Sequence, residues 1–70
     1  MDVRVRIGLN VQRLRRGKEL SQEELAARAD VHQTYLSGVE RGKRNASVLV
    51  LERIAKALGV DVAEFFKKLR

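Results

Sequence analysis

SQEELAARADVHQTYLSGVE, residues 21–40, has the pattern of two short helices that meet at a tight turn and share one apolar side. Ser21 can cap the first of these helices, and Glu24, three residues later, completes a capping box. Leu20 and Leu25 flank the cap as a hydrophobic staple, which fixes the angle at which the chain enters the helix. This pattern is typical of a helix-turn-helix.

The turn between the two helices falls at residues 29–31. A chain that reverses between helices usually needs one residue of positive φ, and Asp is one of the few residues besides Gly that tolerate this conformation. We therefore expect Asp30 in the turn and a second helix from about His32 to Arg41. These bounds place the whole motif at about residues 21–41.

The second helix has two distinct faces when its residues are placed about 100° apart. The face expected to point to the core carries Tyr35, Leu36 and Val39. The opposite face carries Gln33, Thr34, Ser37, Gly38 and Arg41. This outward face is small, polar and uncharged at its start and basic at its end, which suits a helix that enters a nucleic-acid groove end-first; an ordinary solvated face is the alternative. In a groove, Gln33 and Thr34 would reach base edges, and Ser37 would add a weaker contact.

The apolar spacing before this motif predicts a helix from about Val3 or Ile7 to Arg16. The first six residues are left open between a basic arm and the start of this helix. Gly8 inside the helix costs roughly 1 kcal/mol relative to Ala, a loss most simply explained by another helix packed closely there. Gly17 is expected to end the helix.

A polar loop after the motif is expected to run from Arg41 to Ala46, with Gly42 as a left-handed C-cap. Ser47 then caps a helix that Gly59 ends. The core stripe expected for this helix is Val48, Leu51, Ile54, Ala55 and Leu58. The groups placed to hold a nucleic-acid backbone are Lys43, Arg44, Asn45 and Ser47.

A second capping box, Asp61 with Glu64, predicts a last helix at about residues 61–69. Its apolar stripe is Val62, Phe65, Phe66 and Leu69. This stripe exceeds what so small a domain is expected to cover, so we predict a symmetric homodimer through the last helix; the alternative is that all of it is core. The residues expected to meet the second copy are Leu49, Phe66 and Leu69.

Length and composition narrow the class of protein. Seventy residues predict one domain over residues 1–70, and 15 Lys and Arg against nine Asp and Glu give a net charge of +6, which favours a polyanionic partner. The sequence has no Cys, signal peptide or long apolar run, so we expect a cytoplasmic protein without membrane contact. His32, the one histidine, has no ligand cluster at metal spacing, and no catalytic arrangement is recognisable. We expect no enzyme activity, metal, cofactor or small-molecule ligand.

The range Ile7 to Phe66 resembles the lambda-repressor-like, Cro/repressor-type helix-turn-helix regulators, often called the Xre family. The matching pieces are Ile7-Gly8, Val11, Leu14-Arg15, Leu20 through Ala26, Glu40 through Lys43, and Leu51 through Val60. A narrower similarity, to the controller proteins of restriction-modification systems, rests on Thr34 through Ser37, Glu40 through Gly42, and Arg44-Asn45. The departures from the family pattern are Asp30, where Gly is usual, and Ala46, where Pro is frequent.

The resemblance implies an all-α fold, a compact five-helix DNA-binding domain. It also implies that Gln22, at the start of the first motif helix, clamps a phosphate, and that Arg15 pairs with Glu40 to fix the recognition helix on its scaffold. The hypothesis we favour is a sequence-specific regulator of transcription that binds double-stranded DNA as a homodimer on an inverted repeat, with a restriction-modification controller as its narrower form. The alternative is an antitoxin or protein-interaction module of the same fold.

Overall fold

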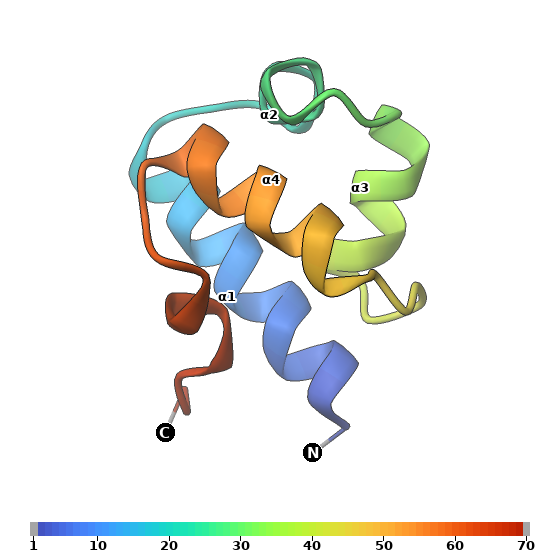
Figure 1. Ribbon diagram of the computed structural model, residues 1–70, viewed down its shortest axis with the longest axis vertical. Helices are drawn as coiled ribbons and strands as arrows, with labels where there is room; N and C mark the ends of the chain where they lie inside the picture. Colours follow the sequence, from blue (N-terminus) through green and yellow to red (C-terminus); the bar gives the residue numbers. More distant parts are fainter. Residues whose placement is uncertain (1, 70) are drawn as a thin grey trace.

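The structure is a computed structural model that describes residues 2–69, and within this range it is helical and contains no β-strand. The elements in chain order are α1 (Val3–Gly17), α2 (Gln22–Ala29), α3 (Gln33–Glu40), α4 (Val48–Leu58) and the 3₁₀ helix η1 (Val62–Phe66). Figure 1 shows α4 lying across α1, with α2 at one end of the molecule and both chain termini at the other. Within the described range, no helix combines the length and apolar character needed to cross a membrane.

Each helical element contributes to a hydrophobic core. Val11 of α1, Leu25 of α2, Leu36 of α3, Ile54 of α4 and Phe65 of η1 are all 0% exposed. Full burial of a side chain of this size stabilises a fold by about 1.5–3 kcal/mol. The core therefore packs against one side of α3, through Leu36.

The N-terminal segment is helical from Val3 onward, so residues 3–6 belong to α1 and do not form a separate arm; Met1 lies outside the described residues. Asp2 caps the helix by accepting a hydrogen bond from the backbone N–H of Arg4 (2.7 Å). The guanidinium of Arg4 also donates to this carboxylate, and these bonds lower the pKa of Asp2 to about 2. The start of α1 is thus fixed by a local pair.

Gly8 lies where α1 crosses the end of α3. A Cβ at this position would stand 2.4 Å from the carbonyl oxygen of Val39 and 2.6 Å from that of Glu40. No side chain fits between the two backbones, so the close packing expected at Gly8 is present. This contact sets the distance between α1 and α3.

The turn of the helix-turn-helix takes the conformation expected from the sequence. Asp30 has φ 58° and ψ 48°, in the left-handed region. Arg53 of α4 donates to the backbone carbonyls of Ala29 (3.1 Å) and Asp30, which satisfies acceptors left free at the end of α2. The turn is therefore tied to α4 as well as to its own helices.

The prediction for the C-terminal segment is wrong in its length and helix type. Instead of an α-helix over residues 61–69, the chain forms a 3₁₀ helix that stops at Phe66, with Lys67 extended at φ −68° and ψ 141°. Residues 2–69 accordingly contain four α-helices and one 3₁₀ helix, not five α-helices. The carboxylate of Glu64 pairs with Lys67 (3.1 Å) and does not complete a capping box with Asp61.

Asn10 of α1 binds this segment where the chain leaves η1. Its side chain is 0% exposed, and its amide donates to the carbonyl oxygens of Phe65 (2.9 Å) and Lys67 (2.8 Å). In an α-helix the Phe65 carbonyl would accept from the N–H four residues later. Asn10 thus holds these two carbonyls against α1 where the chain is extended at Lys67, and Phe66 is left 43% exposed.

Val48 was expected in the core stripe of α4 and is instead 72% exposed. It is the first residue of α4, and side chains on a helix lean toward its N-terminus. Val48 therefore leans past the end of the helix, beyond the reach of the core. Val50, which the sequence pattern did not single out, is partly buried and packs against the core.

Candidate nucleic-acid interface

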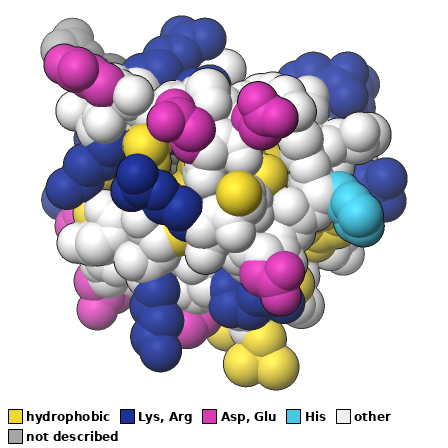
Figure 2. Space-filling view, turned by 90° about the horizontal axis from the view of Figure 1, so that it is seen from above, with side chains coloured by type: hydrophobic (Ala, Val, Ile, Leu, Met, Phe, Trp, Pro, Cys, Tyr) yellow, Lys and Arg dark blue, Asp and Glu magenta, His cyan; other side chains and the backbone are white. Residues whose placement is uncertain are grey.

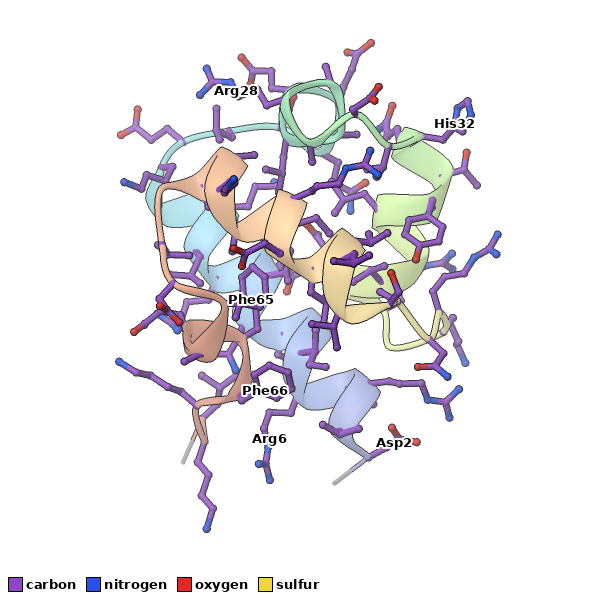
Figure 3. The ribbon with its side chains drawn as sticks, viewed as in Figure 1. Asp2, Arg6, Arg28, His32, Phe65 and Phe66 are labelled. Atoms are coloured by element: carbon purple, nitrogen blue, oxygen red, sulfur yellow. The ribbon has the colours of Figure 1, made fainter. Side chains whose placement is uncertain are left out.

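The start of α3 presents polar side chains to the outside. His32 is the N-cap residue, and its side chain makes no capping hydrogen bond; Figure 3 shows it at the outer edge of the molecule where α3 begins. Gln33 and Thr34 follow and are exposed, whereas Ser37, one turn later, is partly buried. The exposed amide and hydroxyl carry both donors and acceptors, the groups needed to read base edges.

The other end of α3 is fixed by a buried ion pair. Arg15 donates to the carboxylate of Glu40 through two atoms, Nε to Oε2 at 2.7 Å and Nη2 to Oε1 at 3.0 Å. The Glu40 side chain is 0% exposed and that of Arg15 10%. The hydrogen bonds that Arg15 donates to Glu40 raise the pKa of Arg15 above its ordinary value. The pair expected from the sequence is therefore present, with bidentate geometry.

Gln22 extends this pair into a network that joins three helices. Its side-chain amide donates to Oε1 of Glu40 (2.9 Å), and Arg15 donates through Nη1 to the carbonyl of Leu20 (2.8 Å). No pattern in the sequence indicates this contact between Gln22 and Glu40. A primary amide has two N–H donors, so Gln22 keeps one for an external acceptor.

The start of α2 carries the capping box expected from the sequence. The hydroxyl of Ser21 accepts from the backbone N–H of Glu24 (3.0 Å), and the Glu24 carboxylate accepts from the N–H of Ser21 (2.8 Å). The bond from the Ser21 backbone is the main reason why the pKa of Glu24 is lowered. This cap fixes the first turn of α2, where Gln22 lies.

The loop after α3 places its polar residues beside that helix. Gly42 is left-handed (φ 73°), and the N–H of Lys43 donates to the carbonyl of Gly38 (2.8 Å), which closes the end of α3. Ser47 caps α4 by accepting from the N–H of Val50 (3.1 Å). The predicted backbone-contacting residues, all of them exposed, are Lys43, Arg44, Asn45 and Ser47.

Arg44 and Gly38 make a contact that the sequence did not indicate. Gly38 was expected on the outward face of α3 but is buried, because the side chain of Arg44 lies across it. The guanidinium carbon of Arg44 lies 5.4 Å from the centre of the Tyr35 ring, within cation–π range. Tyr35, expected in the core, is only partly buried.

The charge of the molecule is not gathered into one basic patch at the α2 end. Figure 2, seen from above the view of Figure 1, shows Lys and Arg side chains spread around this face with Asp and Glu between them. The candidate interface is therefore defined by particular groups on α3 and its two flanks, the start of α2 and the loop before α4. The net charge alone would not have located it.

The residues expected at a dimer contact are accessible to different degrees. Leu49 is 78% and Phe66 43% exposed, whereas Leu69 is partly buried. Leu49 projects from the outer side of α4, and Phe66 follows the buried Phe65 in η1. Leu49 of α4 and Phe66 of η1 thus leave apolar surface open to solvent.

The chain is similar in sequence and in structure to known helix-turn-helix proteins. A family described as Helix-turn-helix matches residues 11–65. The uncharacterized HTH-type transcriptional regulator y4dJ of Sinorhizobium fredii is 52% identical over 64 residues, which are 91% of this chain and 83% of that protein. The restriction-modification controller protein C.AhdI from Aeromonas hydrophila has a similar structure, with TM-score 0.88 and 40% identity over 90% of this chain and 96% of that one. The controller protein C.Esp1396I, solved as a tetramer with its natural 35 base-pair operator, gives TM-score 0.85 and 33% identity over 94% and 87%.

Proposed function

The chain belongs to the helix-turn-helix family, of the Cro/repressor or Xre type, and we propose that it is a transcriptional regulator that binds double-stranded DNA at specific sequences. The observation that carries this proposal is the accessible polar start of α3 on a helix whose far end is fixed to α1 and α2 through Glu40. A recognition helix needs an exposed polar end and a fixed orientation, because contacts with base edges require defined geometry as well as access.

The narrower proposal is a controller protein of a restriction-modification system. The similarity to C.AhdI and C.Esp1396I over almost the whole chain supports it. The alternative, an antitoxin or interaction module of the same fold, is not favoured, because these relatives are regulators by name. The family is one of DNA-binding regulators and not a class of enzymes. We expect the protein to act in the cytoplasm, where its DNA would lie.

Base contacts are assigned to the start of α3. Gln33 offers an amide that can bond adenine in two places, Thr34 offers a hydroxyl and a methyl group, and Ser37 adds a weaker contact from its partly buried position. The helix enters the major groove with this end first. These three residues specify sequence.

Phosphate contacts are assigned to the two flanks of α3. On one flank, Gln22 has a remaining amide N–H and is oriented by Glu40. On the other flank, the start of α4 adds the partial positive charge of a helix N-terminus. The residues on that flank are Lys43, Arg44, Asn45 and Ser47. They position the protein on DNA without reading its sequence.

In a homodimer, the second copy contributes a second α3 that can bind the other half of an inverted repeat. Leu49 and Phe66, with the partly buried Leu69, are proposed to meet the same residues of a second copy around a two-fold axis. The two α3 helices would then reach half-sites about one helical turn, roughly 34–36 Å, apart on an inverted repeat. Substitution Phe66→Glu should give monomers in sedimentation, whereas Ala27→Glu, on the exposed side of α2, should leave the dimer intact.

Selection of bound sites from random DNA duplexes tests the proposed function. The protein should enrich an inverted repeat and bind it at physiological salt more tightly than a scrambled duplex of the same composition. Gln33→Ala should reduce the binding free energy by about 1–3 kcal/mol and relax the sequence preference at particular bases. Arg44→Ala should weaken binding to all duplexes and reduce the slope of log affinity against log salt concentration by about one unit. Equal binding of selected and scrambled duplexes would show only attraction between a +6 chain and any polyanion.

A further inference from the structure

Arg44 does not extend freely into solvent from the loop after α3. Its Cγ lies directly over Gly38, and its guanidinium carbon lies 5.4 Å from the centre of the Tyr35 ring. Tyr35 and Gly38 are three residues apart on α3 and therefore neighbours on one side of the helix. The side chain of Arg44 thus runs back along α3, from its last turn toward the start that carries Gln33 and Thr34.

The absence of a side chain at position 38 makes this path possible. A Cβ there would stand 2.7 Å from Cγ, 3.4 Å from Nε and 3.6 Å from Cδ of Arg44. The first of these distances is shorter than carbon atoms tolerate without displacement. Arg44 is exposed and its side chain has several rotatable bonds, so a methyl group at position 38 would move it to another rotamer without unfolding α3.

We propose that Gly38 is a positioning residue for DNA binding: it forms a slot on α3 that holds Arg44 against Tyr35 before DNA arrives. This inference rests on the proposed function, and it gives Gly38 a role in DNA binding although Gly38 is not one of the proposed DNA-contacting residues. A long side chain loses rotamer freedom when it is fixed at an interface, and a side chain that is already held loses less. The slot therefore strengthens the contact of Arg44 with DNA, although Gly38 itself does not touch DNA.

The substitution Gly38→Ala tests this role, with Gly17→Ala as its matched control. Gly17 is the last residue of α1, and a Cβ there would meet no atom within 4 Å. Ala is favoured over Gly in helices, so neither change should lower the thermal unfolding midpoint by a helix effect. We expect Gly38→Ala to weaken binding of the selected duplex on the order of tenfold and to reduce the salt slope, as we also expect of Arg44→Ala. Gly17→Ala should bind like the unmodified protein.

A double-mutant cycle separates the slot from other effects of the added methyl group. If Gly38 acts through Arg44, then Gly38→Ala should cost almost nothing further in the Arg44→Ala background. Full additivity would overturn the inference, because it would mean that the methyl group acts by its own route, for instance by contact with DNA. Unchanged affinity and salt slope in Gly38→Ala alone would overturn it too. Failure of the unmodified protein to prefer its selected duplex would instead reject the proposed function.

Discussion

Two segments of this chain carry the same start signal, and only one of them continues as an α-helix. Ser21 with Glu24 and Asp61 with Glu64 have the same spacing. Each is flanked by the apolar pair of a hydrophobic staple, Leu20 with Leu25 in the first case and Val60 with Phe65 in the second. The first forms a reciprocal capping box and opens the eight-residue helix α2. The second forms a side-chain cap to Ala63 and opens the 3₁₀ helix η1, which stops at Phe66. A capping signal therefore locates the beginning of a helix but does not determine its type or length.

The packing of each segment explains the different outcome. α2 buries Leu25, Ala26 and Ala29, which fall on one face at helical spacing and pack in the core with α3 and α4. In η1 only Phe65 is fully buried, and the carbonyl that would continue an α-helix from it accepts instead from Asn10. Tertiary contacts override the local signal in the second segment. The region around α2 and α3 should therefore be destabilised most by removal of the ion pair between Arg15 and Glu40. The C-terminal region should be destabilised most by removal of the Asn10 side chain.

The largest effect is expected at the ion pair that fixes α3. Glu40→Gln leaves the guanidinium of Arg15 buried without its counter-charge, which typically costs about 3–5 kcal/mol. The free energy of unfolding should fall by this amount in urea titrations. The comparison is Lys67→Ala, which breaks the exposed pair with Glu64 in the C-terminal segment and should cost about 0–1 kcal/mol. Similar losses in the two variants would contradict the distinction between the buried and the exposed pair.

Asn10 is expected to give the next largest effect. Asn10→Ala leaves the carbonyls of Phe65 and Lys67 without their donor, and a buried polar group left unpaired costs about 1–3 kcal/mol. Amide hydrogen exchange should accelerate in residues 62–69 and stay slow in α2 and α3. Asn45→Ala, at an exposed loop position, serves as the control and should change neither quantity. Uniform acceleration across the chain would mean that Asn10 supports the whole core and not the C-terminal segment in particular.

The contrast also shows which features a sequence can reveal. The cap at Ser21 and the left-handed turn at Asp30 depend on residues near in sequence, and the sequence predicted both. The bond from Asn10 to Phe65 spans 55 residues, and no local pattern indicates it. The family resemblance supplied the pairing of Arg15 with Glu40, which spacing alone would not have given.

The candidate interface divides in the same way. Helical spacing correctly placed Gln33 and Thr34 on an accessible face of α3. Spacing also put Gly38 on that face, but a side chain from the following loop covers it. A helical projection describes the helix by itself and cannot include a residue from outside that folds over it. A glycine in the middle of an otherwise polar face was the one sign of such a neighbour.

Removal of the two caps should give a smaller difference between the segments. Ser21→Ala removes half of the capping box and should cost about 1 kcal/mol, in the range measured for N-caps of α-helices. Asp61→Ala should lower the free energy of unfolding by only a few tenths of a kcal/mol. The helix η1 is short, and it is held in place by the hydrogen bond from Asn10 and by the burial of Phe65. Thermal unfolding midpoints of both variants against the unmodified protein measure the difference. Equal shifts would show that the cap matters as much for η1 as for α2.

The smallest expected effect is the pH dependence of the α2 cap. The pKa of Glu24 is lowered in the folded protein, chiefly by the hydrogen bond from the Ser21 backbone, so its ionised form stabilises the fold. This stabilisation is complete above the ordinary pKa of a glutamate and is lost as the pH falls through the lowered value. Glu24→Gln keeps the shape of the capping box without a titrating group. The unmodified protein should therefore unfold at a slightly higher temperature than Glu24→Gln near pH 7, and the gap should close as the pH is lowered toward 3. A gap that stays constant over this range would mean that the Glu24 cap owes nothing to the charge of its carboxylate.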